Sequence, residues 1–314
     1  MTGKAAGAAV VAIFGPTAAG KSRVAAAVAG ELGGEVISAD SMQVYRGLPV
    51  LTDQPSGEVI GEVPHHLVAT VSLIEEYSAA RFVLEAAEVL SEVIKRGNLP
   101  LLVGGTGLYI RALLGGFSFA GRADASARQR WQELIASEGM EAAASELEGL
   151  DQQAAATIDV KNPRRLLRAL EAATGPGPSV ADERSRLWSP KSKYRVHSFG
   201  LDPPREELYR IIDKRVDAMF SGGVVEEVRE ALKGEVSRTA CQAIGFKEIQ
   251  CYLEGELTLD EARAAIRQKS RRYAKRQLTW MRKMPDIVRI GMAGRDYAAA
   301  ATSIIEQIQA VYAV

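Results

Sequence analysis

The stretch IFGPTAAGKSRVA, residues 13–25, has the spacing G-x-x-x-x-G-K-[ST] and follows an apolar run, AAVVAIF, at residues 8–14. Between a strand and a helix, such glycines let backbone N–H groups approach phosphate oxygens, the lysine adds positive charge and the hydroxyl can bind Mg²⁺. The alternative is a glycine-rich turn with a capping serine. We predict a phosphate-binding loop, although the motif does not say which phosphate compound it binds. The loop residues are Gly15, Pro16, Thr17, Ala18, Ala19, Gly20, Lys21 and Ser22.

Apolar runs bounded by glycine or proline alternate with helical segments, which is the pattern of a doubly wound parallel sheet. Residues 48–77 are rich in glycine and proline and are predicted to be mostly loop. We therefore predict an α/β fold with a P-loop NTPase-like parallel sheet core flanked by helices, and an inserted all-helical subdomain. The predicted strands lie at residues 8–14, 35–40, 99–105, 194–201 and 286–291.

The inserted subdomain is predicted from a change in the character of the sequence. Residues 118 to about 190 are polar and alanine-rich, with helical periodicity and no good strand. A break occurs at TGPGPS, residues 174–179. We predict that residues 1–117 and 191–314 form the core and that residues 118–190 form the insertion.

Composition limits the classes of protein that this chain can belong to. Among 314 residues, Lys plus Arg and Asp plus Glu both total 39, so the net charge is zero. This excludes a wholly basic nucleic-acid binder but leaves room for a local basic face. Cys241 and Cys251 are typical of free thiols in a reducing compartment. Without an apolar run of roughly 18 residues, we expect no membrane segment, and we expect a cytoplasmic protein.

Two further segments carry candidate functional residues. SADSMQVYRG places Asp40 and Ser41 at the carboxyl end of a predicted strand, where α/β sheets bind ligands. Asp40 could be a general base or metal ligand, or it could form an Asx turn or helix cap. VGGTGLYIRALLGG, residues 103–116, resembles a second glycine-rich turn, although Thr106 and Gly107 could simply cap the next helix.

A basic segment at residues 259–284 is predicted to be one helix. Its only acid within residues 261–283 is Glu261, and Tyr273 and Trp280 lie among the cations. Such a helix suits contact with RNA phosphates and stacking on bases, whereas the alternative is a solvated basic face. The cations are Arg263, Arg267, Lys269, Arg271, Arg272, Lys275, Arg276, Arg282 and Lys283.

Seven blocks of this sequence, in order, resemble those of the tRNA dimethylallyltransferases over nearly the whole chain. They are GPTAAGKS, ISADSMQVYRG, GGTGLYIRALL, NPRRLLRALE, RVDAMFSGGVVEEV, QAIGFKE and YAKRQLTW. The resemblance implies transfer of a dimethylallyl group from dimethylallyl diphosphate to N6 of adenosine 37, beside the anticodon of tRNAs that read codons beginning with U. The products would be N6-isopentenyladenosine and diphosphate.

The resemblance also implies roles for individual residues. The loop would bind the diphosphate, with Lys21, Ser22 and Mg²⁺ held by Ser22 stabilising the leaving group. Arg215 would lie near the diphosphate, and Asp40 would hold the adenine amine and accept its proton as general base. The insertion would grip the anticodon stem-loop, and we expect a monomer. The implied tRNA contacts are Asp40, Ser41, Met42, Gln43, Thr106, Arg128, Arg164, Arg165, Leu166, Leu167, Arg168, Gln242, Ala243, Ile244, Gly245, Phe246 and Lys247.

The chain departs from the family pattern in a few places. Where the family has GT-A-K-P, this chain has LTDQP at residues 51–55, which keeps Thr52 and Pro55 and loses the lysine. IDVKNP also differs from the usual IHPND, and Ser22 replaces the commoner threonine but keeps the hydroxyl. The chain has no C-terminal zinc finger of the eukaryotic type, which suggests a bacterial-type enzyme.

Two other functions remain to be compared with this one. A P-loop small-molecule kinase could use Asp40 as a base for a phosphoryl acceptor. That hypothesis leaves the basic helix and the helical insertion unexplained. A catalytically silent RNA-binding protein would need vestigial loop chemistry, although Lys21, Ser22 and Asp40 are all intact.

Overall fold

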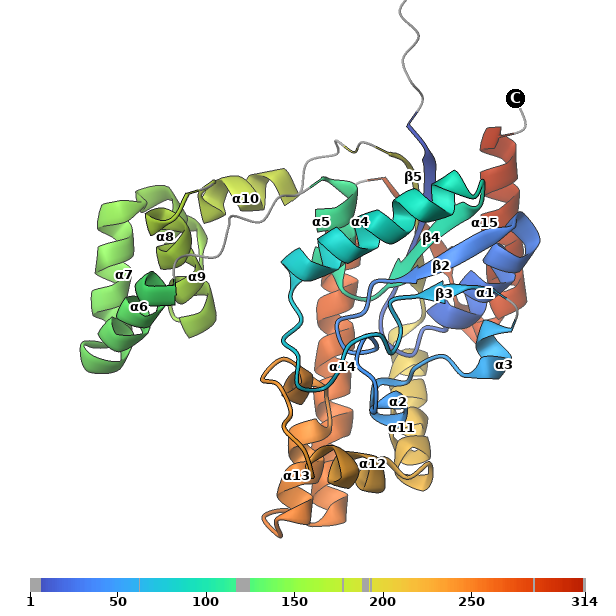
Figure 1. Cartoon of the computed structure of the whole chain (residues 1–314). Coiled ribbons are helices and arrows are strands. Elements are labelled where there is room, and N and C mark those ends of the chain that lie inside the picture. The colour runs from blue at the N-terminus through green and yellow to red at the C-terminus, as the bar shows by residue number, and fades with distance from the viewer. Residues whose placement is uncertain are drawn as a thin grey trace, which may run out of the picture. The chain divides into compact units, whose positions relative to one another are not determined.

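The computed structural model describes residues 7–61, 63–116, 125–176, 178–187, 192, 194–284 and 286–312 (Figure 1). The chain divides into two compact units. One is formed by Met1–Leu114 with Ser192–Val314, and the other by Gly115–Lys191. The predicted boundaries, 117/118 and 190/191, fall outside the described residues, so these exact positions stay predictions.

A six-stranded sheet forms the centre of the first unit, with all strand pairs parallel and the order β3-β2-β4-β1-β5-β6. The predicted α/β fold with a parallel sheet is therefore confirmed. Most of the described residues in 48–77 are loop, as predicted, although the segment also contains two short helices and the edge strand β3, which pairs with Val36 and Ile37. The strands are β1 (Ala9–Phe14), β2 (Gly34–Ser38), β3 (His65–His66), β4 (Leu99–Gly104), β5 (Arg195–Asp202) and β6 (Ile287–Gly291).

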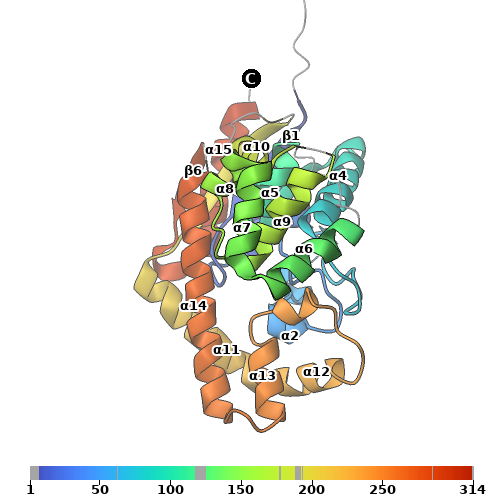
Figure 2. The same ribbon diagram turned by 90° about the vertical axis from the view of Figure 1, so that its left-hand side faces the viewer.

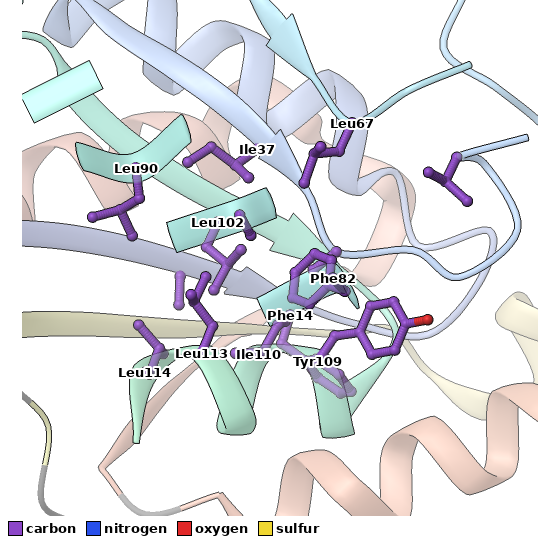
Figure 3. Close-up of a cluster of buried hydrophobic side chains, with 14 of the residues drawn as sticks. Phe14, Ile37, Leu67, Phe82, Leu90, Leu102, Tyr109, Ile110, Leu113 and Leu114 are labelled. Atoms are coloured by element: carbon purple, nitrogen blue, oxygen red, sulfur yellow. The ribbon is translucent and has the colours of Figure 1, made fainter. Parts of the chain in front are cut away.

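Helices cover both faces of the sheet, because alternate residues of each buried strand point to opposite faces. On β1, Phe14 packs into a cluster with α4 and α5, and Ile13 packs into a second cluster with α1 and α15. Figure 3 shows the first cluster, in which the rings of Phe82 and Tyr109 stack with their centroids 4.3 Å apart. The helices of this unit are α1 (Lys21–Leu32), α2 (Pro49–Thr52), α3 (Gly57–Ile60), α4 (Ala79–Lys95), α5 (Gly107–Leu114), α11 (Arg205–Ser221), α12 (Val224–Ala231), α13 (Phe246–Leu253), α14 (Leu259–Lys283) and α15 (Tyr297–Tyr312), with short 3₁₀ turns at Ala240–Gln242 and Ala293–Arg295.

The long basic helix α14 is one continuous helix, as predicted. It begins at a capping box in which Thr258 accepts from the backbone N–H of Glu261 and the Glu261 carboxylate accepts from that of Thr258. Figure 2 shows α14 beside α11, with α12 and α13 near its lower end. The apolar side of this group of helices is a third buried cluster, which includes Phe246 and Ile266.

The described residues of the second unit form helices joined by turns and short loops and contain no strand, as predicted for the insertion. Asn162 caps α9 by accepting from the backbone N–H groups of Arg164 and Arg165, and Pro163 occupies the first helical position. Trp131 and Leu166 are among the buried residues of this unit's own core. The helices are α6 (Ala125–Ser137), α7 (Gly139–Leu150), α8 (Gln152–Thr157), α9 (Pro163–Thr174) and α10 (Val180–Leu187).

Glu35, on β2, joins the edge strand β3 to the turn between α4 and β4, and it is only 3% exposed. Its carboxylate accepts two bonds from Arg96, at 2.9 and 2.7 Å, and one from Asn98 at 2.7 Å. Nε2 of His66, on the edge strand, lies 2.6 Å from Oε2. The Arg96 guanidinium, helped by Asn98 and His66 and opposed by burial, lowers the pKa of Glu35 from 4.5 to about 2.

We predict that this depressed pKa makes the fold sensitive to acid. The stabilisation is fully present above pH 4.5, because Glu35 is then ionised in both states, and it is lost as the pH falls towards 2. Glu35→Gln should lower the free energy of unfolding at pH 7 by on the order of 1–2 kcal/mol and flatten its acid dependence. Urea titrations between pH 2 and 7 measure both effects. Glu88→Gln, at an exposed position of α4, is the control, and an E35Q acid profile equal to that of wild type would contradict the assignment.

Candidate functional site

The predicted phosphate loop connects β1 to α1. Gly20 has φ +81°, and a Cβ there would lie 2.1 Å from the ring of Tyr297, so both the backbone and the neighbouring ring require glycine. The N-terminus of α1, a helix of 12 residues, directly follows the loop and contributes free N–H groups and a partial positive charge. Nζ of Lys21 donates to the carbonyl of Pro16 at 2.9 Å. This arrangement is suited to binding an anion.

A cavity of about 550 Å³ opens beside the loop in the first unit, and it has both charged and apolar walls. The charged and hydroxyl groups come from β-strand ends, the loop after α2, α1 and α11. Valines and an isoleucine form much of the remaining wall. The polar lining includes Lys21, Ser22, Asp40, Asp53, Lys214 and Arg215, and the apolar lining includes Val36, Val59, Val68 and Ile211.

Arg215 lines this cavity and contacts the phosphate loop. Its Nη1 donates to Oγ1 of Thr17, in the phosphate loop, at 2.6 Å and to Oδ2 of Asp53 at 3.1 Å. Because Arg215 is on α11, it brings to the loop a cation that is nearly 200 residues away in the sequence. Asp53 was not predicted as a site residue, and only the tertiary fold places it there.

The charge of Lys21 depends on its surroundings in the cavity. Burial lowers the pKa of Lys21 to about 8, and the nearby Arg215 acts in the same direction. Asp40 and Asp53 oppose this effect. Two cations and two carboxylates therefore interact within one cavity, and an incoming anion would favour the charged form of Lys21.

Asp40 forms the Asx turn that the sequence left open as one possibility, and it also lines the cavity. Its Oδ1 accepts from the backbone N–H groups of Met42 at 2.9 Å and Gln43 at 3.3 Å, as in an Asx turn. Burial raises the pKa of Tyr273 to about 12, and the charge of Asp40 contributes to that rise. The carboxylate therefore organises its own turn while it faces the space beside the phosphate loop.

The second glycine-rich turn, after β4, allows the basic helix α14 to pack closely against it. A Cβ on Gly105 would lie 2.0 Å from Nε2 of Gln277, and one on Gly107 would lie 2.6 Å from the ring of Trp280. Thr106 lies between these glycines, and its Oγ1 accepts from the backbone N–H of Ser41 at 3.4 Å. Packing against α14 therefore explains both glycines without a second anion.

Gln277 is a site-forming residue that the sequence analysis missed. Its Oε1 accepts from the backbone N–H of Thr17 at 2.7 Å, and its Nε2 donates to the carbonyl of Gly105 at 3.0 Å. Only 3% of the residue is exposed. The available signal was its position, because Gln277 follows Ile266, Ser270 and Ala274 on the buried face of α14 at helical spacing.

The cations of α14 fall into two groups. In the first group, Arg271 donates to Asp213, with Nε 3.1 Å from Oδ1. Arg263 and Arg267 are both paired with Asp217, and Lys269 is paired with Glu248. A second group is exposed, and the guanidinium of one member lies 5.4 Å from the centroid of the Tyr273 ring. The exposed cations are Arg272, Lys275, Arg276, Arg282 and Lys283.

The other residues implied to contact tRNA lie in two places. In the first unit, Gln242 and Lys247 are exposed, whereas Ala243, Gly245 and Phe246 are buried and Ile244 is half-buried. In the helical unit, Arg164 and Arg165 are exposed, and Arg128 and Arg168 donate to Glu171 at 2.8 Å and Glu183 at 3.2 Å. Leu166 is fully buried in the unit's core and Leu167 packs against it, so their contribution is to position α9.

The described residues do not form a complete metal site by themselves, because they contain no cluster of three or more His, Cys, Asp or Glu that could hold an ion. The cavity does offer the Ser22 hydroxyl, with the carboxylate of Asp40 in the same lining. This donor set fits Mg²⁺ only if a phosphate ligand supplies further oxygens, which is common for this ion.

No helix in the described ranges has the length and apolar character needed to cross a membrane.

Comparison with known proteins gives a consistent family. A model of the family described as IPP transferase matches residues 43–284, and one described as isopentenyl transferase matches residues 8–66. The tRNA dimethylallyltransferase of Geobacter sulfurreducens is 42% identical over 280 residues, covering 88% of this chain and 90% of the relative. That of Halalkalibacterium halodurans is 40% identical over 290 residues, covering 92% of each chain.

Solved structures agree with these sequence matches. A full-length tRNA isopentenylpyrophosphate transferase from Bacillus halodurans is similar with a TM-score of 0.72 and 38% identity, covering 96% of this chain and 95% of the other. A eukaryotic dimethylallyltransferase acting on tRNA has a TM-score of 0.81 and 25% identity, covering 97% of this chain and 78% of the other. These findings do not favour the kinase or the catalytically silent RNA-binding protein.

We predict that Gln277 holds the phosphate loop in place. Gln277→Leu removes both side-chain bonds and leaves the Thr17 N–H and the Gly105 carbonyl without their partner, which should cost about 1–3 kcal/mol in stability. The Thr17 amide should also exchange with solvent faster than in wild type. Amide exchange by NMR and urea unfolding measure the two effects. Ser270→Ala, on the same buried face of α14, is the control, and a Thr17 amide protected equally in Q277L would contradict this role.

Proposed function

The chain belongs to the tRNA dimethylallyltransferases and transfers a dimethylallyl group to tRNA, and from this premise we propose its donor, its acceptor atom and the residues that act. The donor is dimethylallyl diphosphate, and the acceptor is N6 of adenosine 37 in tRNAs that read codons beginning with U. The observation that carries the proposal is that Lys21, Ser22, Asp40 and Arg215 line one cavity. Cytoplasmic location and a monomeric state stay predictions of the sequence.

The cavity suits a donor with a charged head and a short hydrocarbon tail. The loop amides, the N-terminus of α1, Lys21 and Arg215 would bind the diphosphate. The apolar lining, which includes Val36, Val59 and Ile211, offers a surface for the five-carbon group. Mg²⁺, held by Ser22 and the diphosphate oxygens, would neutralise part of the charge on the leaving group.

The reaction exchanges one bond to carbon for another. The carbon–oxygen bond of the donor breaks, and the electron pair leaves with the diphosphate. A bond forms between the same carbon and N6 of adenine, and N6 loses one proton. Since the N6 lone pair is delocalised into the ring, stabilisation of the leaving group by Lys21, Arg215 and the loop amides must supply much of the rate. Asp40 would receive the proton as general base.

The adenine must leave the anticodon stack to reach a cavity of this kind, as in other enzymes that act on bases. Exposed cations of α14, such as Arg272 and Lys275, provide a surface for the RNA backbone. Exposed Arg164 and Arg165 provide further positive charge on the helical unit. We assign tRNA binding to these exposed residues and assign support of the surface to the buried members of the implied contact set.

The direct test is incubation with isotopically labelled dimethylallyl diphosphate and unmodified tRNA, followed by nuclease digestion and nucleoside analysis. The proposal expects labelled N6-isopentenyladenosine at position 37 and release of diphosphate. A tRNA variant with guanosine at position 37 is the control and should remain unlabelled. Label on another nucleoside, or none from this donor, would refute the proposed donor or acceptor.

We predict that Asp40→Asn keeps the Asx turn intact but slows the transfer reaction. Asparagine can still accept from the N–H groups of Met42 and Gln43, but it cannot take the N6 proton. The single-turnover rate at saturating tRNA and donor should fall by about 10²- to 10³-fold, while donor affinity stays within a few-fold of wild type. Rapid-quench kinetics and donor titration measure the two quantities. An unchanged rate would leave Asp40 with only its role in the turn.

We predict that the exposed and paired cations of α14 respond differently to alanine substitution. The salt dependence of tRNA binding is the slope of the logarithm of the binding constant against the logarithm of the salt concentration. Arg272→Ala or Lys275→Ala should reduce the size of this slope by about 0.7–0.9 for each phosphate contact that is lost. Arg271→Ala should chiefly lower the melting temperature, because it leaves Asp213 without its partner. Filter binding at several salt concentrations and thermal melts decide this. Wild-type slopes in both exposed variants would exclude these residues from the RNA surface.

A further inference from the structure

The guanidinium of Arg215 is shared between the phosphate loop and a carboxylate. Nη1 donates to Oγ1 of Thr17 at 2.6 Å and to Oδ2 of Asp53 at 3.1 Å. The side chain of Arg215 is 21% exposed and that of Asp53 is 54% exposed. Both side chains line the cavity that holds Lys21 and Ser22. A ligand bound at the loop would therefore meet a cation that already has an anionic partner.

The backbone of Asp53 is held firmly at this place. Asp53 ends α2 with φ +54°, a conformation that aspartate tolerates better than most residues. Its carbonyl accepts from Nε2 of Gln43 at 2.7 Å. In return, Nε2 of Gln54 donates to the carbonyls of Gln43 at 3.1 Å and Tyr45 at 2.7 Å. These reciprocal amide bonds keep the Asp53 carboxylate within reach of Arg215.

We propose that Asp53 is a positioning residue that competes with the diphosphate for Arg215 and so weakens the binding of the diphosphate group. The inference rests on the proposed function of the same cavity. Without diphosphate, Asp53 keeps Arg215 beside Thr17. When diphosphate occupies the loop, its oxygens and the carboxylate share one guanidinium, and their like charges repel. Diphosphate binds less tightly as a result, which favours release of the product after transfer.

Asp53→Asn tests this, because asparagine has the same size and removes only the charge. Inorganic pyrophosphate is the probe, titrated calorimetrically into the protein with Mg²⁺ at constant ionic strength. We expect Asp53→Asn to bind pyrophosphate about three- to tenfold more tightly, the range expected for loss of one partly exposed ion pair. The KM for dimethylallyl diphosphate and the inhibition constant of pyrophosphate should fall in parallel. A role limited to the shape of the loop would instead weaken binding or leave it unchanged.

Asp217→Asn is the matched control, because it also removes one negative charge from an ion pair. Asp217 is on α11, pairs with Arg267 and does not line the cavity. It should leave pyrophosphate affinity unchanged. In an Arg215→Gln background, the effect of Asp53→Asn should fall to less than half, because the competition acts through Arg215.

The outcomes separate the inference from the proposed function. If the wild-type protein binds no pyrophosphate, the proposed diphosphate site fails and the inference fails with it. If the wild type binds pyrophosphate and Asp53→Asn binds it equally or more weakly, only the inference is overturned. An undiminished effect in the Arg215→Gln background would also overturn it, because the carboxylate would then act without Arg215.

Discussion

The site depends on the amide of Gln277, which joins the phosphate loop to the turn after β4 through one accepted and one donated hydrogen bond. The two loops follow adjacent parallel strands, β1 and β4, so their backbone groups end at the same edge of the sheet. A buried amide can satisfy a donor on one loop and an acceptor on the other, which a hydrophobic side chain cannot do. The helix that supplies Gln277 also presents exposed cations, and it therefore links the loop to the proposed RNA surface.

Opposed charges determine how the cavity can bind an anion. The cations Lys21 and Arg215 share the cavity with the carboxylates of Asp40 and Asp53, and burial lowers the pKa of Lys21. A diphosphate would further favour the charged form of Lys21 and would compete for Arg215. The site therefore responds to the ligand electrostatically, and the carboxylates prevent the anion from being bound as tightly as the cations alone would allow.

Much of the fold could be predicted because the strands are short apolar runs bounded by glycine and proline, and the phosphate loop has a local spacing that specifies its own geometry. The continuous α14 follows from local signals in the same way. The edge strand β3 escaped prediction because its pairing with β2 depends on backbone bonds rather than on an apolar pattern. The exact boundaries of the helical unit have no local signal of comparable strength.

The sequence by itself determined the parallel sheet, the loop at Gly15–Ser22 and the position of Asp40 at a strand end, because each of these depends on neighbours along the chain. Only the tertiary structure decided which distant groups surround the loop. Arg215, Asp53 and Gln277 reach it from α11, from the segment after α2 and from α14, at separations of 36 to 260 residues from Thr17. Their roles arise from packing between elements, which no local pattern of residues specifies.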